Sequence, residues 1–386
     1  MKKLKYKQKK ICIVSSSRAE LGQLSAIIQK FQKSKKFDTR FVISGTHLSK
    51  LTKFSFKETN DFNLKISKKI YFKMKNYNEK DINVYFSEYV KKFTEYFSKN
   101  KPDLLLILGD RYETLAIVIS AFFFNIPIGH LHGGELTLGS KDDSTRHAIS
   151  KLSNYHFVAN NLFKKRLVRM GENPKSVFTV GSVGLTNLKK LKFLSKSELE
   201  KKLSIKLKKK NIIVTFHPEI DKKKTITLMD KLFKILENYN NINIFISSPN
   251  ADSFSGIIRK KIYDFVKENK NSYFFENLGF INYLSLSKFC NFVIGNSSSA
   301  ITEMPFLGIP SINIGLRQQG RPCAKSVIST KYSKKNINIA IQYLLKKKRS
   351  YKNQKLYYYS NNSNNKVFNL VNKLNLKEKK YKKFFD

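Results

Sequence analysis

Short apolar runs alternate with amphipathic stretches along the first half of the chain. Runs of adjacent aliphatic or aromatic residues predict buried strands, and the stretches between them are typical of helices. The expected strands are residues 11–14, 39–43, 104–108, 126–130, 155–158 and 177–180. The expected helices are residues 20–32, 82–97, 112–124, 143–153 and 162–170. This alternation indicates a buried parallel sheet.

The alternation stops in a Lys- and Ser-rich stretch near residues 189–210 and then starts again. The second series of expected strands is residues 212–216, 242–247, 273–275, 292–294 and 311–314, and helices rich in Lys, Asn and Tyr follow from residue 334. Two such series predict an α/β protein with two Rossmann-like, doubly wound parallel-sheet domains, residues 1–187 and 188–386, facing each other across a cleft. Ligands of such domains bind at the carboxyl ends of the strands.

Composition narrows the class of protein. Of the 386 residues, 41% are hydrophobic and 26% are charged, which excludes a disordered chain. Three cysteines far apart in the sequence, Cys12, Cys290 and Cys323, make no disulfide framework and favour a reducing compartment. Only four apolar residues follow the basic N-terminus, too few for a signal peptide, and the most apolar stretch (115–131) is short for a bilayer span and contains polar residues. We expect a cytoplasmic protein without a membrane segment.

Lysine dominates the charge of the chain. Lys and Arg number 74 against 28 Asp and Glu, a formal net charge of +46, but only ten of the 74 are arginine. A nucleic-acid-binding face would concentrate basic residues, arginine above all, whereas these lysines are spread over nearly the whole chain. We therefore interpret the charge as a solvated lysine surface and expect no specific nucleic-acid partner.

Polar segments follow the strands of the first series. SSSRAE (15–20) follows the first strand, and its Arg18 suits a phosphate, although a helix cap explains the segment equally well. LGDRYE (108–113) ends a strand of five aliphatic residues. A carboxylate at the tip of a buried strand is costly unless it caps the next helix or takes part in chemistry, and Asp110 fits both interpretations.

The densest group of acid/base side chains lies in GHLHGGE (129–135) and DDSTRH (142–147). Three carboxylates and three histidines suit proton transfer. A metal site is the alternative, but no pair of histidines has ligand spacing on one expected helix face. Asp142 or Asp143 also fits a plain N-cap.

Three polar segments follow strands of the second series: TFHPE (215–219), PNAD (249–252) and GNSSS (295–299). The small residues of GNSSS precede an expected helix and let backbone N–H groups bind an anion, and Glu303, one turn further on, is suited to bind a ribose diol. The alternative is that these serines only cap the helix. His217 beside a proline indicates function, and Asn250 is available to a base or sugar. The sequence has no GxGxxG, Walker or CxxC motif and predicts neither metal nor cofactor.

Together these segments resemble the hydrolysing UDP-N-acetylglucosamine 2-epimerases of sialic acid and related nonulosonate synthesis. They occur in family order between residues 11 and 321 and read SSRAELGQL, SGTHLS, LGDRYETL, HLHGGE, DDSTRHAISKLS, VGSVG, FHPE, PNAD, GNSSSAITEMP and NIGLRQQGR. The resemblance implies a glycosyltransferase-B-like fold whose second domain holds most of the nucleotide.

The reaction that the resemblance implies converts UDP-N-acetylglucosamine and water to N-acetylmannosamine and UDP. UDP leaves C1 as the C2 proton is removed, and water then adds to the resulting glycal. No metal or redox cofactor takes part. The resemblance also implies a homo-oligomer, a dimer or a tetramer.

The resemblance assigns site residues to the positions of this sequence that match the family's motifs. The catalytic set that the resemblance implies is Asp110, His132, Glu135, Asp142, Asp143, Arg146 and His217. The UDP and substrate set is Arg18, Gly22, His47, Arg111, Asn250, Ser297, Ser298, Glu303 and Arg317. His132 matches a position that is Glu in animal and non-hydrolysing members, so the identity of the C2 base stays open. Gly22 offers only its backbone where some relatives carry a serine, and Arg321 shares the RQQGR segment with Arg317.

Three alternatives remain at this point. A UDP-N,N'-diacetylbacillosamine 2-epimerase of the legionaminic acid route would carry nearly the same motifs, because its sugar differs at C4 and C6. A glycosyltransferase of the same fold would share the UDP site but has less reason for the HGGE and DDSTRH segments. The net charge allows a nucleic-acid-binding protein, which would bind in a salt-sensitive way and turn nothing over.

Overall fold

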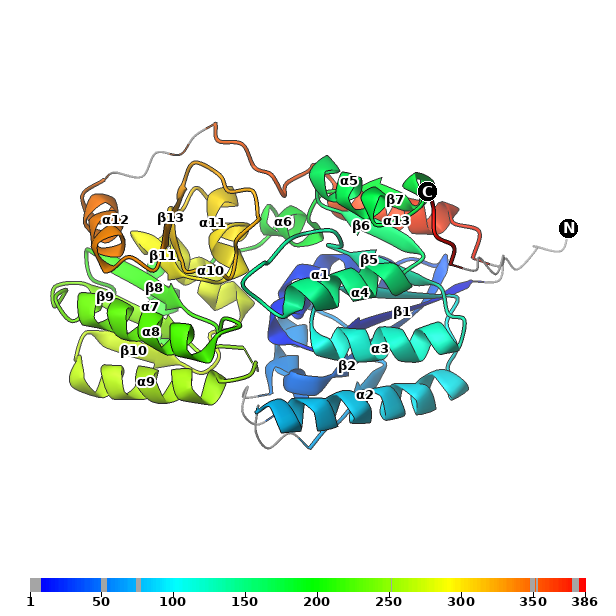
Figure 1. Cartoon of the computed structure of the whole chain (residues 1–386), viewed down its shortest axis with the longest axis horizontal. Coiled ribbons are helices and arrows are strands. Elements are labelled where there is room, and N and C mark those ends of the chain that lie inside the picture. Colours follow the sequence, from blue (N-terminus) through cyan, green and yellow to red (C-terminus); the bar gives the residue numbers. More distant parts are fainter. Residues whose placement is uncertain are drawn as a thin grey trace, which may run out of the picture.

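Two lobes lie side by side in the computed structural model, each built around one parallel sheet (Figure 1). The structure describes residues 8–49, 54–73, 78–250, 252–347, 351, 353–376 and 382–386. No helix in this part of the chain is both long enough and apolar enough to cross a bilayer.

The first sheet has seven parallel strands in the order β3-β2-β1-β4-β5-β6-β7. Their bounds are β1 Lys9–Ser15, β2 Phe37–Ser44, β3 Lys68–Ile70, β4 Leu104–Leu108, β5 Ile128–Leu131, β6 Tyr155–Val158 and β7 Val177–Thr179. Side chains of β1 alternate between the two faces, with Ile11 and Ile13 in one core and Cys12 and Val14 in the other. Strand β1 is thus buried on both sides, which explains its continuous apolar sequence.

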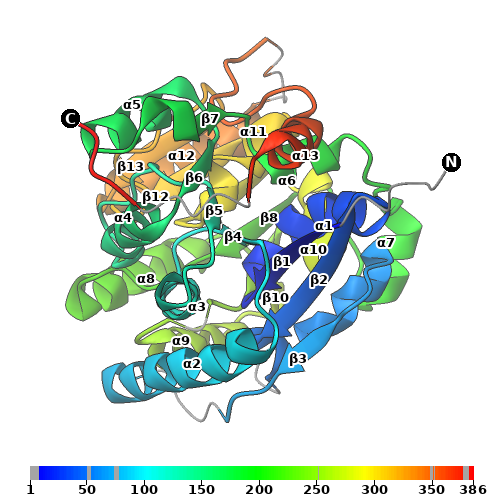
Figure 2. The same ribbon diagram turned by 90° about the vertical axis from the view of Figure 1, so that its right-hand side faces the viewer.

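Helices cover both faces of this sheet (Figure 2). They are α1 Arg18–Gln32, α2 Glu79–Lys99, α3 Tyr112–Phe123, α4 Asp142–Leu152, α5 Asn161–Arg169 and α6 Val183–Leu188, with short 3₁₀ turns at η1 Gly45–Leu48, η3 Ser55–Phe62 and η4 Pro174–Ser176. Helix α1 packs on one face, and α2 and α3 pack on the other.

The second sheet has six parallel strands in the order β10-β9-β8-β11-β12-β13. Its strands are β8 Asn211–Thr215, β9 Asn243–Ser247, β10 Ser272–Phe275, β11 Phe292–Gly295, β12 Ser311–Ile314 and β13 Val327–Lys331. The helices of this lobe are α7 Lys196–Leu203, α8 Lys222–Leu236, α9 Ser255–Glu268, α10 Phe280–Lys288, α11 Glu303–Phe306 and α12 Lys334–Lys346, with a 3₁₀ turn η5 at Ser298–Ala300.

The last helix, α13 (Ser363–Lys373), crosses back to the first lobe (Figure 1). Val367 and Val371 join the core beneath α1, and Lys9 Nζ donates to the backbone carbonyl of Asn372 at 2.6 Å. The domain division at 187/188 remains a prediction. By its contacts, however, α13 packs with the first sheet, whereas the sequence division grouped all terminal helices with the second.

Each strand expected from the sequence exists, but two edge strands, β3 and β13, and two short helices between the two series, α6 and α7, were not predicted. Strand β3 has only three residues, two of them lysine, and β13 is only partly buried, so neither shows an apolar run. Helix α7 lies inside the Lys- and Ser-rich stretch, where Ser195 and Glu198 form a capping box. Because edge strands and short capped helices bury little surface, hydrophobic pattern alone does not reveal them.

Both sheets reverse their strand order at one place, between β1 and β4 in the first and between β8 and β11 in the second. At such a switch point the loops after two neighbouring strands separate and leave a crevice. The expected fold class, two doubly wound parallel-sheet domains, is therefore confirmed, and its geometry places the polar segments at the crevices.

Candidate active site

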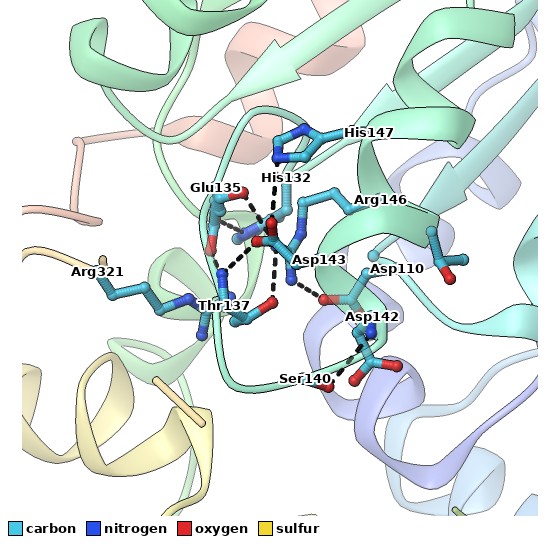
Figure 3. A network of polar contacts seen from close by, with 12 residues as sticks. Asp110, His132, Glu135, Thr137, Ser140, Asp142, Asp143, Arg146, His147 and Arg321 are labelled. Atoms are coloured by element: carbon cyan, nitrogen blue, oxygen red, sulfur yellow. Dashed lines mark hydrogen bonds and ion pairs between the residues drawn. The ribbon is translucent and has the colours of Figure 1, made fainter. Parts of the chain in front are cut away.

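A cavity of about 230 Å³ lies between the two lobes and is lined by loops from both switch points. The first lobe contributes the loops after β1, β4 and β5 and the start of α4. The second lobe contributes the loops after β8, β9 and β11 and the start of α10. Figure 3 shows the acidic and basic side chains that meet at one side.

Asp110 stands directly after β4 and receives a charge-assisted hydrogen bond from Arg146 Nη2 of α4 (Figure 3). Gly109 before it has a φ of +92°, a left-handed conformation that favours glycine. Burial would raise the pKa of Asp110, but the charges of Arg146 and Arg321 outweigh burial and hold that pKa below its usual range. Asp110 is therefore an ionised carboxylate at the cavity wall.

His132 and Glu135 form a pair on the loop after β5. Nδ1 of His132 lies 2.8 Å from Oε1 of Glu135, whose Oε2 accepts from Arg321 Nη2 at 2.6 Å. Burial would raise the pKa of Glu135, but Arg321 and then His132 lower it to about 2. An ionised carboxylate accepts only, so Nδ1 carries a proton, and in the neutral ring the lone pair is then on Nε2. Among the described residues that buried Nε2 has no hydrogen-bond partner, and His132 lines the cavity.

Asp142 begins α4 and meets Arg317 of the second lobe, with 3.1 Å between Oδ2 and Nη2. Burial, followed by the negative charge of Asp110, raises the pKa of Asp142 to about 6, although Arg317 opposes the rise. The cavity thus contains two carboxylates with opposite tendencies. Asp110 stays ionised, whereas Asp142 can carry a proton near neutral pH.

Asp143 turns away from the cavity. Its Oδ1 accepts from the backbone N–H of Thr137 at 2.5 Å and lies 3.6 Å from Arg146 Nη1, and its Oδ2 lies 3.7 Å from His147 Nε2 (Figure 3). These contacts tie the loop after β5 to α4. The geometry makes Asp143 a support for the loop rather than part of the cavity wall.

Serines of the second lobe line the opposite wall. Ser297 caps the η5 turn, and its Oγ accepts from the N–H of Ser299 at 3.4 Å. The hydroxyl oxygen of Tyr283, on α10, lies 2.5 Å from Ser299 Oγ. Glu303 lies one turn further on, and burial raises the pKa of its carboxyl. Hydroxyls and a mostly buried carboxyl at the end of β11 suit a phosphate beside a ribose diol.

His217 follows β8 and is held in place by its backbone. Its N–H donates to Asn296 Oδ1 at 2.7 Å, and its carbonyl accepts from Asn296 Nδ2 at 2.8 Å. Nδ1 of the ring accepts from the backbone N–H of Asn250 at 3.2 Å, so Nε2 carries the proton. Burial, with Arg317 next, lowers the pKa of His217 to about 3. A neutral histidine therefore presents a hydrogen-bond donor to its surroundings.

Two arginines of the first lobe reach the second. Arg111 donates to Glu113 through Nε at 3.0 Å and to Asp252 through Nη1 at 2.8 Å. Arg18 donates through Nη1 to the carbonyl of Glu276 at 2.9 Å and through Nη2 to that of Ser248 at 3.1 Å. Both line the cavity while bridging the lobes.

Thirteen of the sixteen residues expected from the sequence line this cavity. They are Arg18, Asp110, Arg111, His132, Glu135, Asp142, Arg146, His217, Asn250, Ser297, Ser298, Glu303 and Arg317. Asp143, Gly22 and His47 are not among the residues of its wall.

Gly22 and His47 lie behind the cavity. A Cβ at Gly22 would stand 2.2 Å from the ring of Phe280, so the missing side chain makes room for that ring. His47 is fully buried, with Nε2 at 2.8 Å from Ser15 Oγ and Nδ1 at 2.9 Å from Ser55 Oγ. The structure therefore does not support the expectation that His47 contacts a ligand in the cavity. Its ring instead supports the loop after β1.

Sequence reasoning missed several residues of the wall. Those with polar or aromatic side chains are Glu20, Gln23, Thr137, Thr215, Ser247, Phe280, Tyr283, Ser299 and Gln318, and Arg321 was named only as a neighbour of Arg317. Glu20 could have been found, because it ends the SSSRAE segment. Phe280 and Tyr283 sit on an ordinary helix, and no local signal sets them apart.

No cluster of three or more His, Cys, Asp or Glu side chains in the described ranges is arranged to hold a metal ion.

Comparisons with known proteins identify the family of the chain. The family described as UDP-N-acetylglucosamine 2-epimerase matches residues 29–372. A GDP/UDP-N,N'-diacetylbacillosamine 2-epimerase (hydrolyzing) from Campylobacter jejuni is 39% identical over 325 residues, 84% of each chain. The polysialic acid biosynthesis protein P7 from Escherichia coli is 35% identical over 332 residues, 85% of this chain and 84% of the relative. A UDP-N,N'-diacetylbacillosamine 2-epimerase (hydrolyzing) from Legionella pneumophila is 30% identical over 320 residues, 83% and 84% of the two chains.

A solved structure gives the fold independently. The UDP-GlcNAc 2-epimerase from Neisseria meningitidis, solved with UDP-GlcNAc, superposes with a TM-score of 0.79 at 18% identity and covers 94% of this chain and 99% of that one. The glycosyltransferase-B-like architecture expected from the sequence is thus confirmed. With a family match over most of its length and relatives of up to 39% identity, the chain belongs to the UDP-N-acetylglucosamine 2-epimerase family.

Proposed function

We propose that this protein is a hydrolysing 2-epimerase of a UDP-linked 2-acetamido sugar. One observation carries the proposal: the buried Nε2 of His132, which has no hydrogen-bond partner among the described residues, lies at the wall of a cavity that also contains carboxylates of opposite protonation tendency. Removal of a proton from carbon and its return need such a base and such an acid. A glycosyltransferase would need an acceptor pocket and has less use for this cluster.

UDP binds mainly against the second lobe in this proposal. The hydroxyls of Ser297 and Ser298 and the guanidinium of Arg317 meet the diphosphate, and Glu303 accepts from the ribose hydroxyls. Asn250 and the Nε2–H of His217 offer further hydrogen bonds to the nucleotide. This arrangement leaves the sugar toward Asp110 and His132.

The first step is an elimination. Nε2 of His132 takes the proton from C2, the electron pair forms the C1–C2 double bond, and the C1–O bond breaks so that UDP leaves with its electrons. Glu135 stabilises the imidazolium through its 2.8 Å contact with Nδ1. Arg317 offsets the charge that develops on the leaving diphosphate.

Water then adds across the double bond. Asp142, whose raised pKa lets it hold a proton, protonates C2 from the face opposite to the one from which the proton left. Water bonds to C1 and gives its proton to a carboxylate, for which the ionised Asp110 is placed. The products are UDP and the free 2-epimer of the sugar.

UDP-N,N'-diacetylbacillosamine is the first substrate to test. The names of two relatives, at 39% and 30% identity, point to it and reverse the order of substrates expected from the sequence, where UDP-N-acetylglucosamine came first. UDP-N-acetylglucosamine remains the second candidate. The name of the Campylobacter relative includes a GDP form, so the GDP-linked sugar belongs in the same series.

Proton NMR in heavy water tests the proposal. Incubation of the purified protein with each nucleotide sugar in turn should release the nucleoside diphosphate and a 2-epimerised free sugar that carries deuterium at C2. Release of a free sugar that has neither deuterium at C2 nor an inverted configuration there would contradict the elimination. If the sugars remain intact unless an acceptor sugar is added, the protein is a transferase instead.

A further inference from the structure

His130 lies outside the cavity, on strand β5, with no exposed surface. It nevertheless contacts two segments that carry cavity carboxylates. Nε2 lies 2.7 Å from the carbonyl oxygen of Gly109, the residue before Asp110. Nδ1 lies 3.0 Å from Oγ of Ser150, which belongs to the helix that Asp142 begins.

The two partners fix the tautomer of the ring. A carbonyl oxygen can only accept, so Nε2 carries the proton and donates to Gly109. Nδ1 must then accept from the hydroxyl of Ser150. Burial lowers the pKa of His130 to about 3, so the ring stays neutral and keeps this donor and acceptor pattern across the physiological range.

Helix α4 therefore reaches the turn after β4 by two routes. Arg146 bonds the carboxylate of Asp110 directly, and Ser150, four residues further along the helix, reaches the carbonyl of Gly109 through His130. One route holds the side chain of Asp110 and the other holds the backbone that precedes it. Together they set the position of Asp110 relative to Asp142.

The loop after β5 closes over this connection. A Cβ at Gly133 would stand 2.9 Å from Ser150 Oγ and 3.0 Å from His130 Nδ1, so only glycine lets the loop pass there without displacing the pair. His132 and Glu135 flank Gly133 in the same loop. The ring of His130 thus bonds to the turn after β4 and to helix α4 and lies close to the loop after β5, the three segments that supply the acid/base side chains.

We propose that His130 is a positioning residue that joins these three segments and sets the separation of Asp110 from Asp142. The inference rests on the proposed function, because it concerns how that reaction is supported. His130 is not among the residues that line the cavity and acts through residues that are. Its loss should reduce turnover while leaving the binding of UDP by the second lobe intact.

Two substitutions separate its contacts. The amide of a glutamine ends near the position of the histidine Nε2 and can keep the donor to Gly109, whereas the shorter asparagine ends near Nδ1 and loses it. We expect His130→Asn to lower kcat by roughly 10- to 100-fold, the cost of misplacing a reacting group by about 1 Å. KM and the affinity for UDP should change less than about threefold, because the contacts that bind substrate and transition state equally well are unchanged. His130→Gln should recover much of the turnover.

His156 provides the matched control. It lies opposite His130 on the neighbouring strand β6, is equally buried and bonds Glu172 at 2.8 Å, away from the cavity. His156→Asn should lower the melting temperature about as much as His130→Asn but leave the turnover of folded protein unchanged. If His130→Asn lost stability and kept its kcat, His130 would be merely structural and the inference would fail.

Two further measurements keep the test decisive. Should His130→Asn not fold, Ser150→Ala removes only the hydroxyl that holds Nδ1 and should lower kcat with unchanged UDP affinity; a kcat equal to that of the wild type would overturn the inference. A crystal structure of either variant with UDP gives a readout that needs no known substrate. An unmoved Gly109–Asp110 turn would overturn the inference, whereas a wild type without turnover on any nucleotide sugar would contradict only the proposed function.

Discussion

Arg317 of the second lobe and Asp142 of the first face each other at 3.1 Å, between Nη2 and Oδ2. Arg317 opposes the effects of burial and of Asp110, which together raise the pKa of Asp142 to about 6. In the proposed function a bound diphosphate would compete for the same guanidinium group. In the proposed function we therefore expect the binding of phosphate at Arg317 to be coupled to the binding of a proton at Asp142.

Nucleotide binding should therefore take up a proton at pH 7. The diphosphate draws Arg317 away and adds negative charge, and both effects raise the pKa of Asp142 from about 6 toward or above neutrality. UDP-glucose is a suitable probe, because its diphosphate has no titrating group near neutral pH. Calorimetry in two buffers of different ionisation enthalpy should show uptake of up to about one proton per nucleotide.

Neighbouring aspartates provide the control for this experiment. Asp142→Asn should bind UDP-glucose without the uptake, whereas Asp143→Asn, which alters a carboxylate outside the cavity wall, should keep it. The same uptake in the wild type and in Asp142→Asn would show that another group titrates and would contradict the coupling.

The two carboxylates that Arg111 binds should have separable roles. Glu113 is fully buried in the same lobe as Arg111, so Glu113→Gln should lower the free energy of unfolding by about 3–5 kcal/mol, because it leaves a buried guanidinium partly uncompensated. Asp252 lies across the cleft, so Asp252→Asn should mainly raise KM for the nucleotide sugar, by about tenfold, with little change in melting temperature. Denaturant unfolding and steady-state kinetics distinguish the two; equal losses of stability would contradict this division.

A side chain at position 22 should impair nucleotide binding from behind the cavity. The Cβ of Gly22→Ala would meet the Phe280 ring at 2.2 Å, and Phe280 begins α10 in the other lobe. The ring must move, so we expect UDP affinity to fall by about tenfold while the first lobe stays folded. Gly256→Ala on α9 is the control, since a Cβ there meets nothing within 4 Å. Unchanged affinity in Gly22→Ala would show that the ring position does not matter for the nucleotide.

The sequence revealed the parts of the site that follow central strands. Asp110, His132 and His217 come directly after apolar runs, and parallel strands bring such positions to one edge. It could not show that Asp143 turns away from the cavity while Asp142 enters it. Adjacent residues on a helix point about 100° apart, and only the packing of α4 decides which one faces the cleft.

Residues that act across the two lobes were the hardest to predict. Phe280 fills the space above Gly22, and Arg321 reaches Glu135, which lies 186 positions away in the sequence; the two residues of each pair belong to different lobes. His47 belongs to the expected substrate set and His130 to the GHLHGGE segment, but both are buried behind the wall. A sequence motif marks such residues without saying whether they contact a ligand or hold the residue that does.

Stability in acid should report His47 and Glu20, which lie together beneath the loop after β1. Burial lowers the pKa of His47 to about 3, so below pH 6.5 the unfolded chain binds a proton that the folded chain does not, and stability falls as pH falls. Burial raises the pKa of Glu20 to about 7, so between pH 4.5 and 7 the folded chain binds the extra proton, and the sign is opposite. Denaturant unfolding at several pH values between 5 and 6 gives the slope of the free energy of unfolding against pH. This slope should be about 1.4 kcal/mol per pH unit smaller in His47→Gln than in the wild type, and larger by a similar amount in Glu20→Gln. Both differences are expected whatever either substitution does to the absolute stability. Parallel curves for all three proteins would mean that neither group keeps its shifted pKa in the folded state.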